Sequence, residues 1–495
     1  MDFFFFFLVN CLLCLFSFTF LGFLARKAAN NQTPAAKLPP GPARLPIIGN
    51  IHNLGLNPHK SLADLAKVHG PLMSLKLGQV TTIVASSPAV AKEILQKHDK
   101  LLSDRHITLA MEAGDIHKFG LPLLPVDSKW RNLRKVCNSY VFTPRKLDSN
   151  QDLRREKITE LLEGVRRNVC ERPGEAVEVG RLVFKASLNA LSSTILSMDL
   201  ADEEKQFKEL ASGMTHEAGT PNLGDFFPFL AKFDLQGIQR RIRVHMEKAL
   251  NLFEWLIDQR LRERKSESYV SANDVLDTLL AINDDAENRE EVHMDLFVAG
   301  TDTTATTLEW AMAELLRNPK ALTKLKEELD QTIGKENHLN ESDIPRLPYL
   351  QAVIKEIFRL HPPLPLLLPH KAGVDVEIDG FTVPKGAQIL VNLWAIGRDP
   401  MIWDDPNSFT PERFLGSEVD ARGNHFELIT FGAGRRICPG MSLAYRMLHM
   451  MLGSLVHWFD WKLPSGVKPE QLNMKEKFGV TLQKAKPLLA IPTLR

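Results

Sequence analysis

The sequence is poor in cysteine, in excess charge and in repeats, and each shortage excludes a class of protein. Five cysteines among 495 residues are too few and too scattered for a disulfide framework. Lys and Arg number 61 against 60 Asp and Glu, so the net charge of +1 gives no indication of nucleic-acid binding. We find no internal repeat and no second long apolar run after the N-terminal one. What remains is an ordinary globular composition, 44% hydrophobic and 24% charged, with ample material for a large core.

Residues 1–25 are predicted to form a membrane anchor. The run from Phe3 to Leu24 is almost wholly apolar and free of charge, and it is long enough to cross a bilayer core of ~30 Å as a helix. Asp2 precedes this run and basic residues such as Arg26 follow it, so the positive-inside rule leaves the start in the lumen and the remainder in the cytosol. A cleaved signal peptide is the alternative, but it would have basic residues before a shorter apolar run.

Residues 26–46 form a proline-rich linker, and residues 47–495 are predicted to form one globular body. The prolines of the linker exclude a helix and favour an extended arm. Helical periodicity dominates the body, and short alternating segments predict small sheets. Two hairpins are expected, Leu72–Leu77 with Thr81–Ser86 and Gly479–Leu482 with Leu488–Ile491. The fold class is therefore mainly α with small β-sheets (α+β).

Among the cysteines, Cys438 has the most informative surroundings. Cys137 and Cys170 are expected to be free core thiols, whereas Cys438 ends a glycine-rich turn, and the apolar run from Met441 to Phe459 that follows predicts a buried helix. A cysteine at the start of a helix lies beside unpaired backbone N–H groups and the positive end of the helix dipole. Both effects favour the thiolate, which is the form that binds metal.

The neighbours of Cys438 are of the types that a flat, anionic metal cofactor requires. Gly434 and Gly440 allow the backbone to pass close under a flat ligand. Phe431 can cover the sulfur, and Arg436 can meet an anionic group. These residue types suit a haem iron held by one axial cysteine. They belong to one stretch, Phe431-Gly432-Ala433-Gly434-Arg435-Arg436-Ile437-Cys438-Pro439-Gly440.

The whole pattern Phe-x-x-Gly-x-Arg-x-Cys-x-Gly resembles the haem-ligand loop of the cytochrome P450 monooxygenases. The resemblance implies the cytochrome P450 fold and a haem b with Cys438 as axial ligand. It also implies that a molecule of O2 and electrons from NADPH, supplied by NADPH–cytochrome P450 reductase, insert one oxygen atom into a C–H bond of a small apolar substrate. Together with the predicted anchor, it implies a single-pass protein of the endoplasmic reticulum membrane with a cytosolic catalytic body.

A threonine-rich segment lies inside the helix predicted over Leu296 to Leu316. Ala299-Gly300-Thr301-Asp302-Thr303-Thr304 is poor helix-forming material, and Thr303 can draw a backbone carbonyl out of the helical ladder. A hydroxyl and a carboxylate at such a gap suit oxygen activation, where protons must be delivered, so Asp302 and Thr303 are predicted as the relay. The alternative is a helix with incidental threonine back-bonding. In the family, this acid–alcohol pair lies over the haem, opposite the cysteine.

Glu356 and Arg359 lie three residues apart on a segment that is apolar nearly all round. Charges on such a helix are expected to be buried, and they must then be paired and fully hydrogen-bonded. The resemblance adds Arg413 as a third member. The predicted triad is a structural network that fixes the cysteine loop, with no chemical step of its own.

Trp130 and Arg134 share one helical face at i and i+4. The two propionates of haem need cationic or N–H donors, and the resemblance assigns this task to Trp130, Arg134 and Arg436, with His370 as a further donor. The same helix carries a basic face formed by Lys129, Arg131 and Lys135. That face is either a solvated surface or a docking site for an acidic reductase.

Two stretches, 124–135 and 392–400, are similar to the plant terpenoid-oxidising group of the family that includes geraniol 8-hydroxylase. Pocket positions carried over by this resemblance are apolar: Phe297, Ala299, Leu366, Leu367, Phe478, Gly479 and Val480. They favour a hydrophobic terpenoid over a zwitterionic amino acid, although hydroxylation of tyrosine, as in one branch of the group, stays open. Two other classes also stay open: a haem isomerase or dehydratase that needs no external electrons, and a non-catalytic membrane haem carrier or sensor.

Two further segments bear on the roof of the pocket and on contact with the membrane. Between Asp274 and Gly300 the chain is shorter than relatives in the family it resembles by about one helical turn. Glu287, Glu290 and Glu291 stand where apolar residues are usual in that family, so the start of the threonine-containing helix is expected to be trimmed. The phenylalanine-rich stretch from Gly219 to Gly237 is a lid, a second apolar contact with the membrane, or a packed loop.

Overall fold

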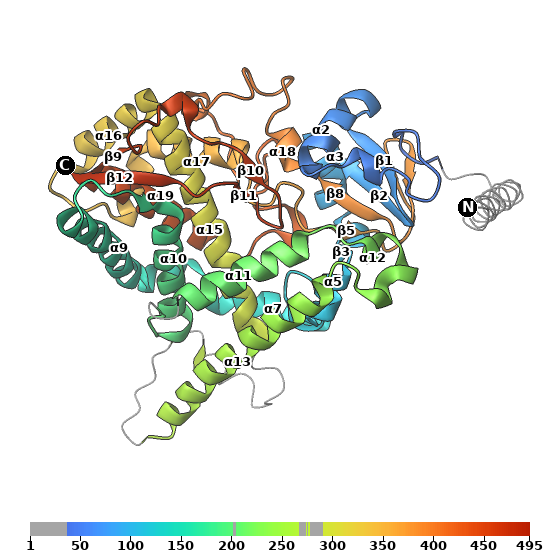
Figure 1. Cartoon of the computed structure of the whole chain (residues 1–495), viewed down its shortest axis with the longest axis horizontal. Coiled ribbons are helices and arrows are strands. Elements are labelled where there is room, and N and C mark those ends of the chain that lie inside the picture. The colour runs from blue at the N-terminus through green and yellow to red at the C-terminus, as the bar shows by residue number, and fades with distance from the viewer. Residues whose placement is uncertain (1–36, 201–203, 267–273, 275, 278–290) are drawn as a thin grey trace, which may run out of the picture.

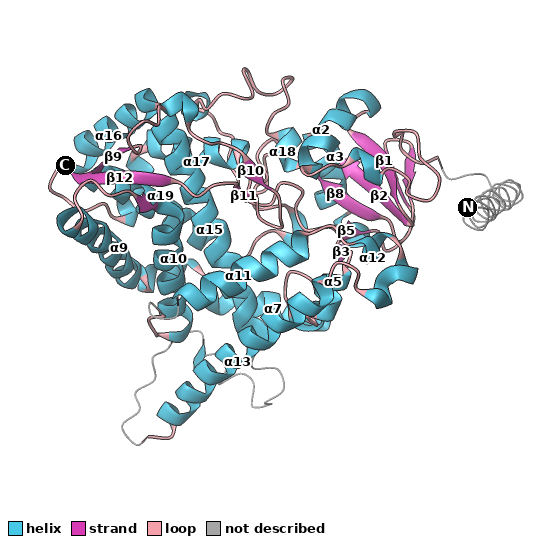
Figure 2. Ribbon diagram, viewed as in Figure 1, coloured by secondary structure: helices cyan, strands magenta, loops and turns pink. Residues whose placement is uncertain are grey.

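The computed structural model describes residues 37–200, 204–266, 274, 276–277 and 291–495. Helices form most of this part, and a sheet lies toward one end (Figures 1 and 2). The longer helices are α2 (Pro58–His69), α7 (Ser128–Val136), α9 (Gln151–Glu171), α10 (Val179–Leu196), α11 (Glu204–Gly219), α13 (Ile238–Arg264), α15 (Glu291–Arg317), α16 (Pro319–Ile333), α17 (Pro348–Leu360) and α19 (Met441–Trp458). The predicted fold class, mainly α with small sheets, is confirmed.

Short helices connect these elements. They are α3 (Pro88–Lys92), α4 (Asp99–Leu102), α5 (Leu109–Ala113), α6 (Ile116–Phe119), α8 (Pro144–Ser149), α12 (Leu223–Phe226) and α18 (Leu393–Ile396). Several of them begin with a side chain that accepts a backbone N–H of the first turn. The longer helix α7 begins in the same way, because the side chain of Asp127 accepts the N–H of Trp130.

The largest sheet has five strands in the order β1-β2-β8-β5-β3. Its strands are β1 (Leu72–Leu77), β2 (Val80–Ala85), β3 (Asp104–Arg105), β5 (His370–Lys371) and β8 (Gln388–Val391). The first predicted hairpin is confirmed, because β1 and β2 pair antiparallel from Leu72 with Ala85 to Leu77 with Val80. Strand β8 joins β2 in parallel and brings the segment after α17 beside the N-terminal sheet.

The second predicted hairpin is wrong. Strand β11 (Gln483–Lys484) pairs with β10 (Glu476–Lys477), and β12 (Leu489–Leu494) lies between β4 (Val177–Glu178) and β9 (Phe459–Lys462). The residues between β11 and β12 lie along α15 instead of forming a turn, and β12 takes partners far away in the sequence. The remaining pair, β6 (Val376–Ile378) with β7 (Phe381–Val383), forms a separate small hairpin.

Helix α15 passes through the main core. Its Leu308, Trp310 and Ala311 are fully buried, and it packs against α10 and α19. The Trp310 ring stacks on His361 at 4.1 Å between ring centroids, just after α17. The helix thus has a fixed position between the cysteine loop on one side and the C-terminal segment on the other.

The predicted anchor at residues 1–25, Cys11, Cys14 and the acidic segment around Glu287 and Glu290 lie outside the described residues. Within residues 37–495, leaving out the gaps given above, none of the helices combines the length and the apolar character that crossing a bilayer requires. The prediction for Cys137 is confirmed, since it is buried, whereas Cys170 is exposed at the end of α9 and is not a core thiol.

Candidate active site

The cysteine loop is closed on itself and held against the N-terminal sheet region. The N–H of Cys438 donates to the carbonyl oxygen of Phe431 at 2.9 Å, and α19 begins at Met441 with Gly440 as its N-cap. A Cβ on Gly434, whose φ is +66°, would lie 2.0 Å from the carbonyl oxygen of Leu95. Gly434 therefore permits a close approach to protein backbone, whereas Gly440 is the glycine beside the sulfur.

The protonation of Cys438 depends on opposing effects. The N–H groups of Gly440 and Met441 point at the sulfur and, with the charge of Arg134, favour the thiolate. Burial acts in the opposite direction and outweighs them, so the pKa of the Cys438 thiol is raised. The backbone N–H groups therefore only partly offset the effect of burial, and a metal ion at the sulfur would favour the thiolate further.

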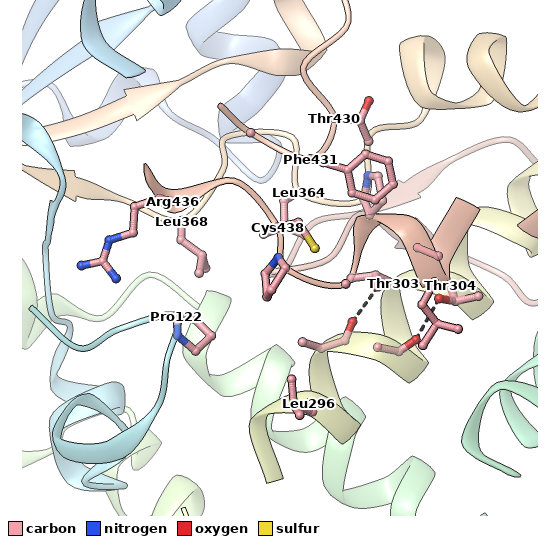
Figure 3. Close-up of a pocket in the computed structure, with 18 of the residues that line it drawn as sticks. Pro122, Leu296, Thr303, Thr304, Leu364, Leu368, Thr430, Phe431, Arg436 and Cys438 are labelled. Atoms are coloured by element: carbon pink, nitrogen blue, oxygen red, sulfur yellow. Dashed lines mark hydrogen bonds between the residues drawn. The ribbon is translucent and has the colours of Figure 1, made fainter. Parts of the chain in front are cut away.

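A cavity of about 270 Å³ lies between the cysteine loop and α15. Figure 3 shows Cys438 and Phe431 reaching it from the loop, and Leu296, Thr303 and Thr304 from α15. Along α15 the lining positions recur at helical spacing, which makes one face of the helix a wall of the cavity: Leu296, Ala299, Gly300, Thr303, Thr304 and Thr307. Among the described residues, no Asp or Glu lines the cavity.

The threonine hydroxyls on α15 return to their own helix. Thr303 Oγ1 donates to the carbonyl oxygen of Ala299 at 2.6 Å and Thr304 Oγ1 to that of Gly300 at 2.8 Å, as the dashed lines of Figure 3 show. The helix nevertheless continues through this segment without a break. The threonine hydroxyls donate to carbonyl oxygens of their own helix without interrupting its backbone hydrogen bonds. The local gap in helical hydrogen bonding that the sequence predicted is therefore absent from α15 as described.

Asp302 points away from the cavity. Its carboxylate accepts the Thr481 hydroxyl at 2.6 Å and a side-chain N–H of Gln483 at 3.0 Å, and the residue is 5% exposed. Burial raises the pKa of Asp302, and the two hydrogen bonds oppose that rise. Although Asp302 and Thr303 adjoin in sequence, their side chains thus lie on different faces of α15, about 100° apart around the helix.

The three charges expected around Glu356 meet in the core. Arg359 donates twice to the carboxylate of Glu356, at 2.7 Å each, and Arg413 Nε donates at 3.2 Å. Arg359 further donates to the carbonyl oxygens of Gly397 and Pro406, both at 2.6 Å. Glu356 also accepts the backbone N–H of Thr410 at 2.8 Å. The network joins α17 to the segment that precedes the cysteine loop.

Three arginines converge at one end of the cavity: Arg105, Arg134 and Arg436. Among the described residues, no carboxylate forms an ion pair with any of them. Burial lowers the pKa of Arg105 to about 9 and that of Arg436 to about 10. The Arg436 guanidinium lies 5.1 Å from the Trp130 ring centroid and donates to the carbonyl oxygens of Ser103 and Leu124. This end of the cavity therefore carries positive charge that no ion pair compensates, although Asp104 and Asp127 act on Arg436 without contacting it.

His370 lies beside the arginines. Its Nδ1 is 2.8 Å from the carbonyl oxygen of Leu102, and a carbonyl only accepts, so Nδ1 carries the proton. Burial and the charge of Arg105 lower the pKa of His370 well below its usual range. The neutral ring then has no proton on Nε2, so donation to an anion requires a second proton.

These residues fit a haem. The cavity is apolar, a cysteine sulfur lies in one wall, and the uncompensated arginines at one end match two propionate groups. The sequence interpretation missed Arg105, which lies on strand β3 and donates to the carbonyl oxygens of Pro122 and Leu368, both at 2.8 Å. The only signal was a lone arginine in a loop, and the sheet contact that places it is not visible in the sequence.

Of the predicted substrate positions, two line the cavity: Ala299 and Leu367. Phe297 packs instead against Phe207 and Phe253, with ring centroids 5.9 and 5.3 Å away. It lies one residue off the lining face of α15, so it points into the core. The other four positions lie outside the lining: Leu366, Phe478, Gly479 and Val480. Phe478 stacks on His59 at 5.4 Å.

The fold and this site define a haem monooxygenase of known architecture: the chain belongs to the cytochrome P450 family, whose model matches residues 39–490. This family holds its iron through a cysteine thiolate and takes electrons from NADPH through a reductase.

Among similar proteins is a geraniol 8-hydroxylase of Catharanthus roseus, 52% identical over 95% of both chains. A geranylhydroquinone 3''-hydroxylase of Arnebia euchroma is 47% identical over 95% of this chain and 97% of its own. A drimenol monooxygenase of Persicaria hydropiper is 47% identical over 94% of each. The resemblance to the plant group that includes geraniol 8-hydroxylase is thereby confirmed.

Proposed function

We propose that the protein is a membrane-bound plant monooxygenase that hydroxylates a terpenoid at an unactivated C–H bond, with Cys438 as the iron ligand. The observation that carries the proposal is that Cys438, from the loop, and Thr303, from α15, line the same apolar cavity. When bound, haem supplies the oxidant that places one atom of O2 in the substrate.

The roles of the surrounding residues follow from their contacts. Arg105, Arg134 and Arg436 neutralise the two propionates, with Trp130 beside them and His370 as a donor once it is protonated. Phe431 covers the sulfur from the loop, where its ring meets Phe358 edge-on at 5.2 Å.

Thr303 delivers protons into the cavity, and Asp302 replaces them. The Thr303 hydroxyl is one of the hydroxyl groups on the lining face of α15, and it belongs to the residue next to Asp302. Asp302, with its raised pKa, holds a proton near neutral pH more readily than an ordinary aspartate does. The triad of Glu356, Arg359 and Arg413 keeps the cysteine loop in register and takes part in no chemical step.

The charge distribution of the cavity favours a terpenoid over tyrosine. Among the described residues the lining has no carboxylate for an amino acid's ammonium group, and its arginines lie at the propionate end. The relatives named above act, by their names, on geraniol, geranylhydroquinone and drimenol, which are terpenoid compounds. A substrate of this class gains binding energy from apolar burial alone.

Membrane attachment is proposed through residues 1–25, with a second contact from exposed apolar side chains. Phe229 is 65% exposed and Ile47 is 67% exposed. Their segments lie at the same end of the body, because the N–H of Gln79 in the β1–β2 turn donates to the carbonyl oxygen of Phe226 at 2.8 Å. This placement supports a single-pass protein of the endoplasmic reticulum with a cytosolic body. Carbonate extraction of microsomes is expected to release a chain lacking residues 1–25 and to leave the full chain bound.

Electron supply is proposed from NADPH–cytochrome P450 reductase docking on α7. Arg131 and Lys135 are exposed on this helix, whose other face carries Trp130 and Arg134 toward the cavity. A charge reversal at Arg131 and Lys135 is expected to raise the KM for reductase and to weaken its salt dependence. An unchanged salt dependence would leave the basic face as a solvated surface.

The decisive experiment reconstitutes the full chain with reductase, NADPH and a panel of geraniol, drimenol and tyrosine. Oxygenated terpenoid formed with matching NADPH and oxygen consumption is the expected result. Cys438→Ser is expected to abolish both turnover and the red-shifted ferrous–CO band, while Cys170→Ser, at an exposed cysteine, keeps both. Turnover without NADPH would instead indicate an isomerase or dehydratase, and haem binding without any turnover a carrier or sensor.

A further inference from the structure

We propose that Thr481 and Gln483 are positioning residues for Asp302, which hold its carboxyl on the side of α15 that faces away from the cavity between successive proton deliveries. The inference rests on the proposed role of Asp302 as proton source. It assigns to the C-terminal segment a part in the reaction that the cavity lining does not reveal, since neither residue reaches the cavity.

Both oxygens of the carboxyl are occupied by this segment. Thr481 Oγ1 donates to Oδ2 of Asp302 at 2.6 Å, and Gln483 Nε2 donates to Oδ1 at 3.0 Å. Gln483 Nε2 also lies 3.4 Å from Thr481 Oγ1, so the two donors support each other. A carboxyl held through both oxygens cannot turn toward the cavity until at least one of these bonds breaks.

The two donors stand on a rigid support. Between them, Leu482 accepts the indole N–H of Trp310 at 2.9 Å and donates its own N–H to the carbonyl oxygen of Pro363 at 2.8 Å. Further along, the N–H of Leu488 donates to Glu309 Oε1 at 2.7 Å. Because α15 holds the segment at Leu482, between the two donors, and again at Leu488, Thr481 and Gln483 have a fixed position relative to the carboxyl.

The surroundings favour proton exchange on this side. Thr481 and Gln483 are neutral, so the carboxyl can gain or lose a proton without leaving a buried cation unpaired. Lys208 on α11 is the cation whose charge acts on Asp302; it donates to Glu178 at 3.0 Å, and Glu309 lies on the same side of α15. Gln483 is partly exposed, which opens this side to water.

The proton balance of the proposal is simple. Asp302 gives one proton to the Thr303 hydroxyl while that hydroxyl passes its own proton into the cavity, and water on the α11 side then reprotonates Asp302. After each proton transfer, Thr481 and Gln483 form their hydrogen bonds to the carboxyl again. Their hydrogen bonds therefore set both its orientation and its acid strength.

The test uses the full-length haem-loaded protein with reductase and geraniol, in the variants Thr481→Val, Thr481→Ser and Gln483→Leu. Product formed per NADPH is measured against pH, and the infrared carbonyl stretch of Asp302 in the resting enzyme is assigned by difference from Asp302→Asn. Loss of a donor to the charged form raises an acid's pKa. Thr481→Val and Gln483→Leu are each expected to shift the acid's apparent pKa upward by about one unit and to move its carbonyl band, with KM for geraniol unchanged.

Controls separate this role from a structural one. Thr481→Ser keeps the hydroxyl and is expected to restore the parent profile. Thr301→Val removes a buried hydroxyl from the same turn of α15, one that bonds only to the carbonyl oxygen of Phe297 at 2.7 Å, and is expected to leave the profile unchanged. An intact ferrous–CO band reports the fold of each variant.

Two outcomes would overturn the inference, and they are distinguishable. In the first, Asp302→Asn lowers the yield per NADPH, but Thr481→Val and Gln483→Leu have the same pH profile and the same infrared carbonyl band as Thr301→Val. The positioning role is then wrong and the proton role stands. If Asp302→Asn itself leaves the yield unchanged, the proton role fails and the positioning role fails with it.

Discussion

Glu356 and Asp302 are both buried carboxylates, and they are held in opposite ways. Glu356, at 0% exposure, receives two N–H groups of Arg359, one of Arg413 and the backbone N–H of Thr410. Asp302, at 5% exposure, receives only a hydroxyl and an amide from neutral side chains. A carboxylate between two buried cations cannot be protonated without leaving them unpaired, whereas one between neutral donors can. The first arrangement fixes structure, and the second permits proton transfer.

The largest effect is expected from Glu356→Gln. The change leaves two buried guanidinium groups without their carboxylate, so it is expected to lower the free energy of unfolding by about 3–5 kcal/mol and to abolish haem retention. Urea denaturation and the ferrous–CO spectrum measure the two effects. Asp64→Asn, which removes an ion pair with Lys67 at the surface, serves as control and is expected to cost less than about 1 kcal/mol. Equal urea midpoints for Glu356→Gln and the control would contradict the structural assignment.

Asp302→Asn is expected to leave the fold and the haem content unchanged while product formation falls by about 10²-fold. Asparagine can still accept one of the two hydrogen bonds, so little stability is lost. Rapid kinetics with saturating reductase, together with haem content from the pyridine hemochrome, checks both statements. Loss of haem in this variant would place Asp302 with Glu356 as a structural carboxylate.

Thr303→Ala is expected to keep haem and to divert reducing power to hydrogen peroxide, with product per NADPH falling about tenfold because water partly replaces the hydroxyl. Thr194→Ala is a matched control, since Thr194 on α10 makes the same bond to its own helix, to the carbonyl oxygen of Ala190 at 2.6 Å, and Thr194 itself does not line the cavity. Peroxide and product are measured in the same reactions. Unchanged coupling in Thr303→Ala would remove the relay.

The smallest expected effect is on how the free energy of unfolding depends on pH. Burial raises the pKa of Asp302, so the folded state binds a proton more tightly than the unfolded state. The parent should therefore lose stability relative to Asp302→Asn as pH rises from the unfolded pKa of about 4 to the raised folded pKa, by about 1.4 kcal/mol for each unit of the shift. Urea midpoints of both proteins across this range measure the slope. A difference that stays constant with pH would mean that Asp302 has an ordinary acid strength.

The sequence predicted best those features that depend on local pattern or strong chemistry. The alternation of Leu72–Leu77 and its neighbour predicted the first hairpin, because side-chain period and a Gly-Gln turn are both local. The ion pair of Glu356 and Arg359 was predictable because buried charge on an apolar helix must find a partner. The cysteine loop was recognisable because its whole pattern, Phe-x-x-Gly-x-Arg-x-Cys-x-Gly, is contiguous in the sequence and resembles the loop of the family.

The failures all depend on long-range placement. Arg105 becomes part of the site only because β3 joins β5 in the sheet, 265 residues away at His370. The predicted C-terminal hairpin does not form because its two halves bind elsewhere. Leu482 accepts a hydrogen bond from Trp310 on α15, and β12 pairs with β9. Phe297 and Asp302 were placed in the cavity by motif position, whereas the rotation of α15 turns both away from it.

The prolines that precede the first sheet have a practical consequence. Strand β1 is the outer strand of its sheet, and Ser74 on it donates its N–H to Pro40 and its hydroxyl to Pro39. Proline offers no amide proton, so this covering strip satisfies β1 while presenting no new donor for another chain to pair with. A version cut at Lys37 keeps this cover and should stay monodisperse, whereas one cut at Ala43 would leave Ser74 unpaired at the sheet edge and is expected to aggregate.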